Sequence, residues 1–254
     1  MSSSLTQHPR GGYLFLPGID PYSSGVVAAD GFEICHVLLE SPVAWETGLH
    51  AVHDWLRAQD LSVQALCGVQ LRCSEPHSFG SFSEFNSRYR SLLDEWGIPV
   101  DGVNPVARTN VAPVLSPPAE TTLFAFSFCR RSDVQAKTFV VAGGGELPHR
   151  DLRAEHIVRR GETLPDAMLE KASCVTGIMN HRLQKLDVAK SPLSTVNVYT
   201  AHPVHSLLES VLLADLPAAR RCGILWHYTR PPVQEIEFEM DVRYVRTELT
   251  LKLL

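Results

Sequence analysis

Residues 219–239, ARRCGILWHYTRPPVQEIEFE, contain the pattern that decides the predicted fold. The run from Cys222 to His227 is predicted to be a strand, and Pro231-Pro232 then breaks the chain because proline has no backbone N–H to donate. Alternating acidic and apolar residues after this break predict a closing strand from Glu235 to Val245. The same order occurs at residues 107–125, ARTNVAPVLSPPAETTLFA, which indicates a repeat.

Outward from these two stretches, each half of the chain repeats the order strand, helix, strand, helix, strand, Pro-Pro, strand. The predicted strands are 32–39, 63–73, 107–114 and 121–129, then 137–142, 194–199, 222–227 and 235–245; the predicted helices are 45–58, 81–96, 166–186 and 205–214. Strands and helices mix without strict alternation, which is typical of the α+β class. We therefore predict two tandem domains, residues 11–131 and 134–254, each a mixed sheet packed on two helices.

Composition excludes several classes of protein. The formal net charge is -5, and no basic cluster of the kind that binds nucleic acid is present. No apolar stretch is long enough to span a bilayer, and residues 1–10 have no signal-peptide core, so they are expected to be a disordered lead-in to a cytoplasmic protein.

The six cysteines form no CxxC pair and are expected to be reduced. His149, His156, His202 and His205 lack the spacing of a metal site. Gly143-Gly144-Gly145 is expected to be a flexible turn rather than a phosphate loop, since no Lys-Ser/Thr ending follows it.

Four short motifs resemble the RidA/YjgF family of enamine and imine deaminases. They are Ile19-Asp20-Pro21-Tyr22-Ser23, Phe85-Asn86 with Tyr89, Ala219-Arg220-Arg221-Cys222, and Glu235-Ile236-Glu237. Each motif is short, but their order and spacing cover nearly the whole chain as two copies. The resemblance implies two RidA-like, chorismate-mutase-like domains in a trimer-like ring, with ligand clefts between adjacent domains. It also implies a homo-oligomer, a trimer of tandem chains, with no nucleic-acid or membrane partner.

The resemblance assigns roles to two residues of the second half. Arg220 would bind the substrate carboxylate, and Glu237 would activate the water that displaces ammonia from an imine carbon, with no metal or organic cofactor. These residue types suit the chemistry on physical grounds as well. A guanidinium grips a carboxylate with two parallel hydrogen bonds. A carboxylate near the imine can take a proton from water and return one to the leaving nitrogen.

Each half lacks motifs that the other keeps. The first half retains Arg108 as a possible substrate-binding residue, but Leu123-Phe124-Ala125 stands where the acidic pair is expected. The second half has no Pro-Tyr-Ser turn and no Phe-Asn-x-x-Tyr helix. We therefore predict a composite site at a domain junction. Arg220, Glu237 and Cys222 would come from the second half, and the substrate-binding residues Tyr22 and Asn86 from the first.

Three functions remain open at this point. The first is hydrolytic deamination of a small unsaturated imine or enamine acid, of the 2-aminoacrylate or 2-aminomuconate type. The second is cleavage of an enol ether by a chorismatase-like hydrolase, which also has two related domains. The third is non-catalytic binding of a small carboxylate. Release of ammonia would separate the first function from the other two.

Overall fold

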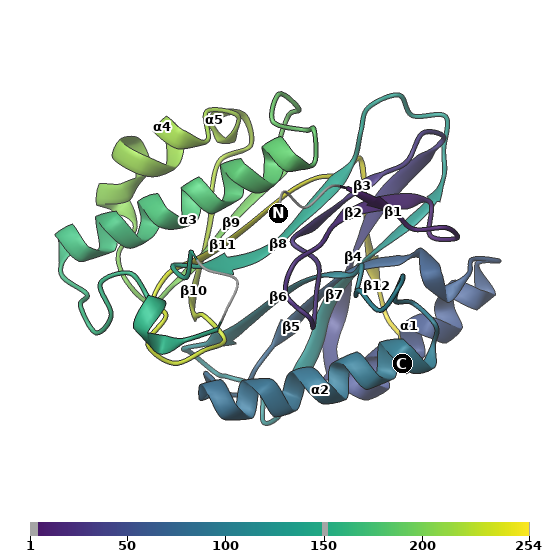
Figure 1. Ribbon diagram of the computed structural model, residues 1–254, viewed down its shortest axis with the longest axis horizontal. Coiled ribbons are helices and arrows are strands. Elements are labelled where there is room, and N and C mark those ends of the chain that lie inside the picture. Colours follow the sequence, from purple (N-terminus) through teal and green to yellow (C-terminus); the bar gives the residue numbers. More distant parts are fainter. Residues whose placement is uncertain (1–4, 149–151, 254) are drawn as a thin grey trace.

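The computed structural model describes residues 5–148 and 152–253, and within them one mixed sheet of twelve strands runs through both halves of the chain (Figure 1). The strand order is β1-β2-β3-β8-β11-β9-β10-β6-β5-β7-β4-β12. The strands are β1 (Thr6–Gln7), β2 (Tyr13–Leu16), β3 (Gly25–Ala28), β4 (Phe32–Ala44), β5 (Leu66–Arg72), β6 (Ala107–Pro113), β7 (Thr122–Arg131), β8 (Phe139–Gly145), β9 (Thr195–Thr200), β10 (Leu225–Arg230), β11 (Glu239–Tyr244) and β12 (Thr247–Leu251).

The prediction of two tandem RidA-like domains, each with its own sheet, is wrong. The halves share one sheet because β10 pairs with β6 through Thr229 and Arg230. The halves also exchange edge strands: β3 of the first half pairs with β8 of the second, and β12 at the end of the chain pairs with β4. These exchanges cover sheet edges that would otherwise leave backbone N–H and C=O groups unpaired. The boundary predicted at residues 131–134 falls where β7 ends.

The helices flank the sheet in two groups (Figure 1). Helices α1 (Trp45–Ala58) and α2 (Phe79–Glu95) belong to the first half, and α3 (Pro165–Lys185) to the second. Shorter helical turns follow at Val63–Ala65, Ala154–His156, His205–Leu207, Leu208–Leu212 (a π-helix), α4 (Leu213–Asp215) and α5 (Ala219–Cys222). Each group covers its own apolar core: α1 and α2 pack on β4, β5 and β7, whereas α3 packs on β8, β9 and β11. A third buried cluster, which includes Tyr13, Phe15 and Val26, joins the two halves.

Local structure differs from expectation around the stretch that decided the fold. Arg220 and Cys222 lie in the one-turn helix α5, and the strand begins only at Leu225. The closing strand begins at Glu239 rather than Glu235, because residues 234–235 form a turn in which Glu235 has a φ of 70°, and residues 236–238 belong to no strand. Residues 6–7, expected to be disordered, pair with β2 instead. The earlier part of that predicted lead-in, residues 1–4, lies outside the described residues.

In the part of the chain that the structure describes, no helix is both long and apolar enough to cross a membrane.

Candidate active site

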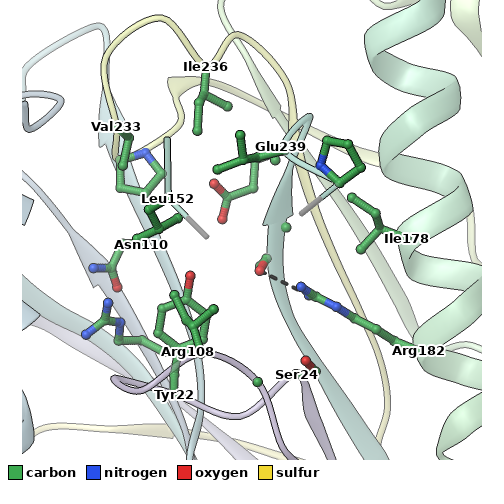
Figure 2. A pocket seen from close by; sticks show the side chains of 18 of the residues that line it. Tyr22, Ser24, Arg108, Asn110, Leu152, Ile178, Arg182, Val233, Ile236 and Glu239 are labelled. Carbon is green, nitrogen blue, oxygen red and sulfur yellow. Dashed lines mark hydrogen bonds between the residues drawn. The ribbon is translucent and has the colours of Figure 1, made fainter. Parts of the chain in front are cut away.

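A cavity of about 400 Å³ lies between the two halves of the chain (Figure 2). The first half contributes the segment between β2 and β3, strand β6 and helix α2. The second half contributes β8, α3 and the turn that leads into β11. The lining residues are Leu16, Gly18, Ile19, Tyr22, Ser24, Phe82, Arg108, Asn110, Gly143, Gly144, Gly145, Leu147, Pro148, Leu152, Cys174, Gly177, Ile178, His181, Arg182, Pro232, Val233, Ile236 and Glu239. Most of the wall is apolar, and a few polar groups converge on the space, as in small-molecule sites generally.

Arg108, on β6, is a buried cation at one wall of the cavity. Only 3% of its surface is exposed, and its Nη2 donates a hydrogen bond of 2.6 Å to Oδ1 of Asn86 on α2. Its guanidinium carbon lies 4.7 Å from the ring centre of Tyr22 and 4.6 Å from that of Tyr89. Burial lowers the pKa of Arg108 from its ordinary value, and the π-faces of the rings favour the retained positive charge. Its Nη1 is buried and has no hydrogen-bond partner among the described residues.

Asn110 lies two residues further along β6 and therefore on the same face of the strand. Both polar atoms of its amide, Oδ1 and Nδ2, are buried without a partner within the described ranges. Figure 2 shows this amide next to the Arg108 guanidinium at the cavity wall. A buried donor without a partner costs about 1–3 kcal/mol, so orphaned donors on two residues of the same strand face indicate a place for an external acceptor. A carboxylate, which only accepts hydrogen bonds when ionised, matches the Nη1 and Nδ2 donors.

Glu239, the first residue of β11, extends its carboxyl group into the same space (Figure 2). Only 5% of the residue is exposed. Burial raises the pKa of Glu239 well above its ordinary value, and the negative charges of Asp241 and Glu146 raise it further. Arg182 and Arg108 oppose this rise without cancelling it. A carboxyl group with a raised pKa can donate a proton near neutral pH and then act as a base.

The glycines at the end of β8 make room for this carboxyl group. A β-carbon on Gly143 would overlap Oε1 of Glu239 and would lie 3.1 Å from Cγ2 of Thr109. On Gly145 a β-carbon would lie 2.7 Å from Cγ2 of Ile236. The stretch expected to be a flexible turn is therefore the end of a strand, and its missing side chains form part of the cavity.

Arg182 reaches the cavity from α3 and adds a second positive charge on the side of the second half (Figure 2). Its Nη1 donates hydrogen bonds of 2.8 Å to the carbonyl oxygen of Ala142 and 3.1 Å to that of Gly143. These bonds tie α3 to the strand that carries the glycines.

The residues predicted from the sequence divide into two groups. Tyr22 and Arg108 line the cavity, whereas Asn86 does not line it but accepts the hydrogen bond from Arg108. By contrast, Arg220 and Cys222 are exposed on α5, and neither is among the lining residues. Glu237 is half-buried beside the cavity and bonds to His202, with 3.0 Å between Oε2 and Nε2. The cavity thus combines residues of both halves, and its ionisable side chains from the second half are Glu239, Arg182, His181 and Cys174.

Sequence reasoning missed Asn110, Arg182 and Glu239 as site residues. Asn110 could have been found, because it shares a strand face with Arg108. Glu239 was expected on the predicted closing strand together with Glu235 and Glu237, but the strand begins only at Glu239. Arg182 gave no signal, since a basic residue near the end of a helix is ordinary. For metal binding, the described residues contain no group of three or more His, Cys, Asp or Glu side chains that could hold an ion. His149 lies outside those residues.

The buried Glu239 carboxyl group and the buried Arg108 guanidinium share one cavity, as polar groups do in sites that bind small molecules. Comparison with known proteins shows which family of enzymes has this sequence. Residues 5–249 match the family model described as 2-aminomuconate deaminase CnbZ. A protein of Comamonas testosteroni, 2-amino-5-chloromuconate deaminase, is 36% identical over 251 residues, which cover 95% of this chain and 96% of that protein. The chain belongs to the 2-aminomuconate deaminase CnbZ family. This supports the predicted deaminase activity but not membership of the RidA/YjgF family.

Among solved structures, a chorismatase crystal structure aligns with a TM-score of 0.46 and 12% identity, covering 97% of this chain and 80% of that one.

Proposed function

We propose that this protein hydrolyses a 2-aminomuconate-type substrate to the corresponding 2-oxo acid and ammonia. The observation that carries the proposal is the pairing, in one cavity, of the buried Glu239 carboxyl group with the orphaned donors of Arg108 and Asn110. Family membership supports the reaction class, and the cavity supports the roles of the residues.

The orphaned donors suit the carboxylate next to the reacting carbon. Nη1 of Arg108 and Nδ2 of Asn110 would each donate to it, while the bond from Nη2 to Asn86 holds the guanidinium in place. Arg182 places its positive charge near the other end of the cavity, where it suits the second carboxylate of a muconate (Figure 2). Apolar side chains such as Ile178 and Val233 would contact the unsaturated carbon chain between the two carboxylates.

Glu239 would move protons in each step of the reaction. Its protonated carboxyl group donates a proton to a carbon of the enamine, which becomes an iminium ion. The resulting carboxylate takes a proton from water as the water oxygen bonds to the C=N carbon. Glu239 then passes that proton to the nitrogen, the C–N bond breaks, and ammonia leaves. The remaining hydroxyl proton returns to Glu239 as the C=O bond forms, so one water is consumed for each ammonia released.

The first test compares Glu239→Gln with Glu237→Gln in an ammonia-release assay on 2-aminomuconate generated in situ. Positioned acid–base groups contribute roughly 10²–10⁴-fold, so Glu239→Gln is expected to lower kcat by at least about 100-fold. Glu237→Gln changes the same chemical group two residues away, outside the cavity lining. The proposal is overturned if Glu239→Gln remains active, and Glu237→Gln is expected to keep the kcat of the wild type.

Two further measurements check the assigned roles. Arg108→Met removes charged hydrogen bonds worth about 1.5–3 kcal/mol, so the KM should rise roughly 10- to 100-fold.

Because Glu239 must be protonated at the start and its pKa is raised, kcat should fall as pH rises through that pKa. If the wild type releases no ammonia from any enamine acid, the protein is not a deaminase. Enol-ether hydrolysis or simple carboxylate binding would then be tested.

A further inference from the structure

A buried ion pair lies beside the cavity without lining it. Nζ of Lys171, on α3, is 3.0 Å from Oε1 of Glu146, which directly follows β8. Both side chains are completely inaccessible to solvent. Replacing such a pair with apolar residues of similar volume is often neutral or stabilising, so stability alone gives a weak reason for two buried charges here.

The carboxylate of Glu146 binds the backbone immediately before Glu239. Its Oε1 accepts a hydrogen bond of 2.7 Å from the backbone N–H of Glu237, and its Oε2 accepts one of 3.0 Å from that of Phe238. Residues 237 and 238 precede the first ladder residue of β11, so the Glu146 side chain replaces the strand partner that these N–H groups lack. Oγ1 of Thr200 donates to the carbonyl oxygen of Glu237 at 2.7 Å and fixes the same peptide from the other side.

Lys171 connects this anchor to the rest of the cavity wall. Its Nζ also donates a hydrogen bond of 2.7 Å to the carbonyl oxygen of Val158. The backbone N–H of Val158 in turn donates to the carbonyl oxygen of Glu146 at 3.0 Å. The pair therefore joins the end of β8, the start of β11 and helix α3, which carries Arg182 one turn beyond Ile178.

We propose that Glu146 and Lys171 are positioning residues, which fix the entry of β11 so that the Glu239 carboxyl group is held in the cavity over Gly143. This inference rests on the proposed catalytic role of Glu239. The negative charge of Glu146 also contributes to the raised pKa of Glu239, so the pair influences both the place and the acidity of that group.

The test measures kcat, KM and the pH profile for Glu146→Gln, together with the binding of unreactive cis,cis-muconate by calorimetry. We expect kcat to fall roughly 10- to 100-fold, in the range expected for a misplaced acid–base group. The alkaline limb of kcat should move to lower pH, because a neutral amide no longer raises the pKa of Glu239. The Kd of muconate should stay within about threefold, since Arg108 and Asn110 are untouched.

Two other variants keep the inference testable. In Glu146→Leu/Lys171→Met, apolar groups fill the volume but cannot accept from the N–H groups of residues 237 and 238. We expect this variant to fold and to bind muconate, with a kcat as low as that of Glu146→Gln. The matched control is Glu235→Gln, which breaks the exposed ion pair with Arg160 (2.8 Å) in the same turn and should leave kcat and its pH profile unchanged.

The outcomes separate this inference from the proposed function. If Glu239→Gln is inactive but Glu146→Gln has the kcat and pH profile of the wild type, the positioning role is wrong and the proposed function stands. If Glu146→Gln loses kcat and muconate binding together, the pair supports the whole cavity rather than Glu239, which also overturns the inference. If Glu239→Gln is active, the proposed function itself fails.

Discussion

Glu239 occupies a place where its own negative charge is unfavourable, because burial and the nearby Asp241 both disfavour ionisation. In the unfolded chain its pKa returns to the ordinary range, about 4.3. The folded protein therefore binds this proton more tightly than the unfolded chain does. Whatever stability the protonated group contributes is complete below the unfolded pKa, and it is lost as pH rises toward the folded pKa. A catalytic group held in this way makes the protein less stable than it could be.

At the residue scale we predict that Glu239→Gln raises the stability of the protein although it lowers kcat by at least about 100-fold. A neutral amide of similar size removes the cost of ionisation, so the Tm of the variant should exceed that of the wild type near pH 8, by at least about 2 °C for each kcal/mol gained. The difference should shrink as pH falls toward 4. Thermal melts of both proteins from pH 4 to pH 9 provide the measurement. A Tm difference that does not change with pH would show that Glu239 titrates normally in the fold.

At the scale of elements, the absence of a side chain at Gly143 lets the Glu239 carboxyl group lie against β8 and lets β8 approach Thr109 on β6. We predict that Gly143→Ala displaces the Glu239 carboxyl group and pushes against Thr109 on β6. Overpacking of this kind costs about 1–3 kcal/mol. The variant should lose more kcat than stability accounts for, measured at a temperature where it is fully folded. Gly80→Ala is the control, since its β-carbon meets only Oγ of Ser78, at 3.8 Å.

Single helices and strands could be predicted from the sequence, whereas the pairing of the strands could not. Helix α1 was predicted at 45–58 and is observed there, because Leu49, Val52 and Leu56 mark one helical face and are all buried. The strand that carries Arg108 was likewise predicted from its own residues, at 107–114, and is observed as β6. Strand pairing is a long-range property, and no local pattern shows that β3 joins β8 or that β12 joins β4. The acid at the site was placed two residues too early, because alternation continues through 235–239 although the backbone there turns.

At the scale of the whole molecule, the cavity exists only because the two halves are held in a fixed position relative to each other. Asp241 on β11, which is 2% exposed and lies between the halves, helps to fix that position. Its Oδ2 accepts from Nε2 of Gln70 on β5 at 3.2 Å and from the hydroxyl of Tyr199 at 2.9 Å, and its Oδ1 accepts from Nδ2 of Asn197 at 2.7 Å. One carboxylate thus satisfies donors from both halves at the centre of the shared sheet.

We predict that Asp241→Asn lowers the free energy of unfolding by roughly 3 kcal/mol, since an amide nitrogen would face at least one of these buried donors and leave it unpaired. Because the sheet is continuous, both halves should still unfold in one transition, and ammonia release should be lost in parallel with the native signal. Urea unfolding followed by tryptophan fluorescence and by circular dichroism would show this as coincident curves. Asp187→Asn, which breaks the exposed pair with Lys137 at 3.2 Å, should cost less than about 1 kcal/mol. Two separate transitions in the Asp241 variant would instead mean that the halves are independent domains and that the junction adds little to their stability.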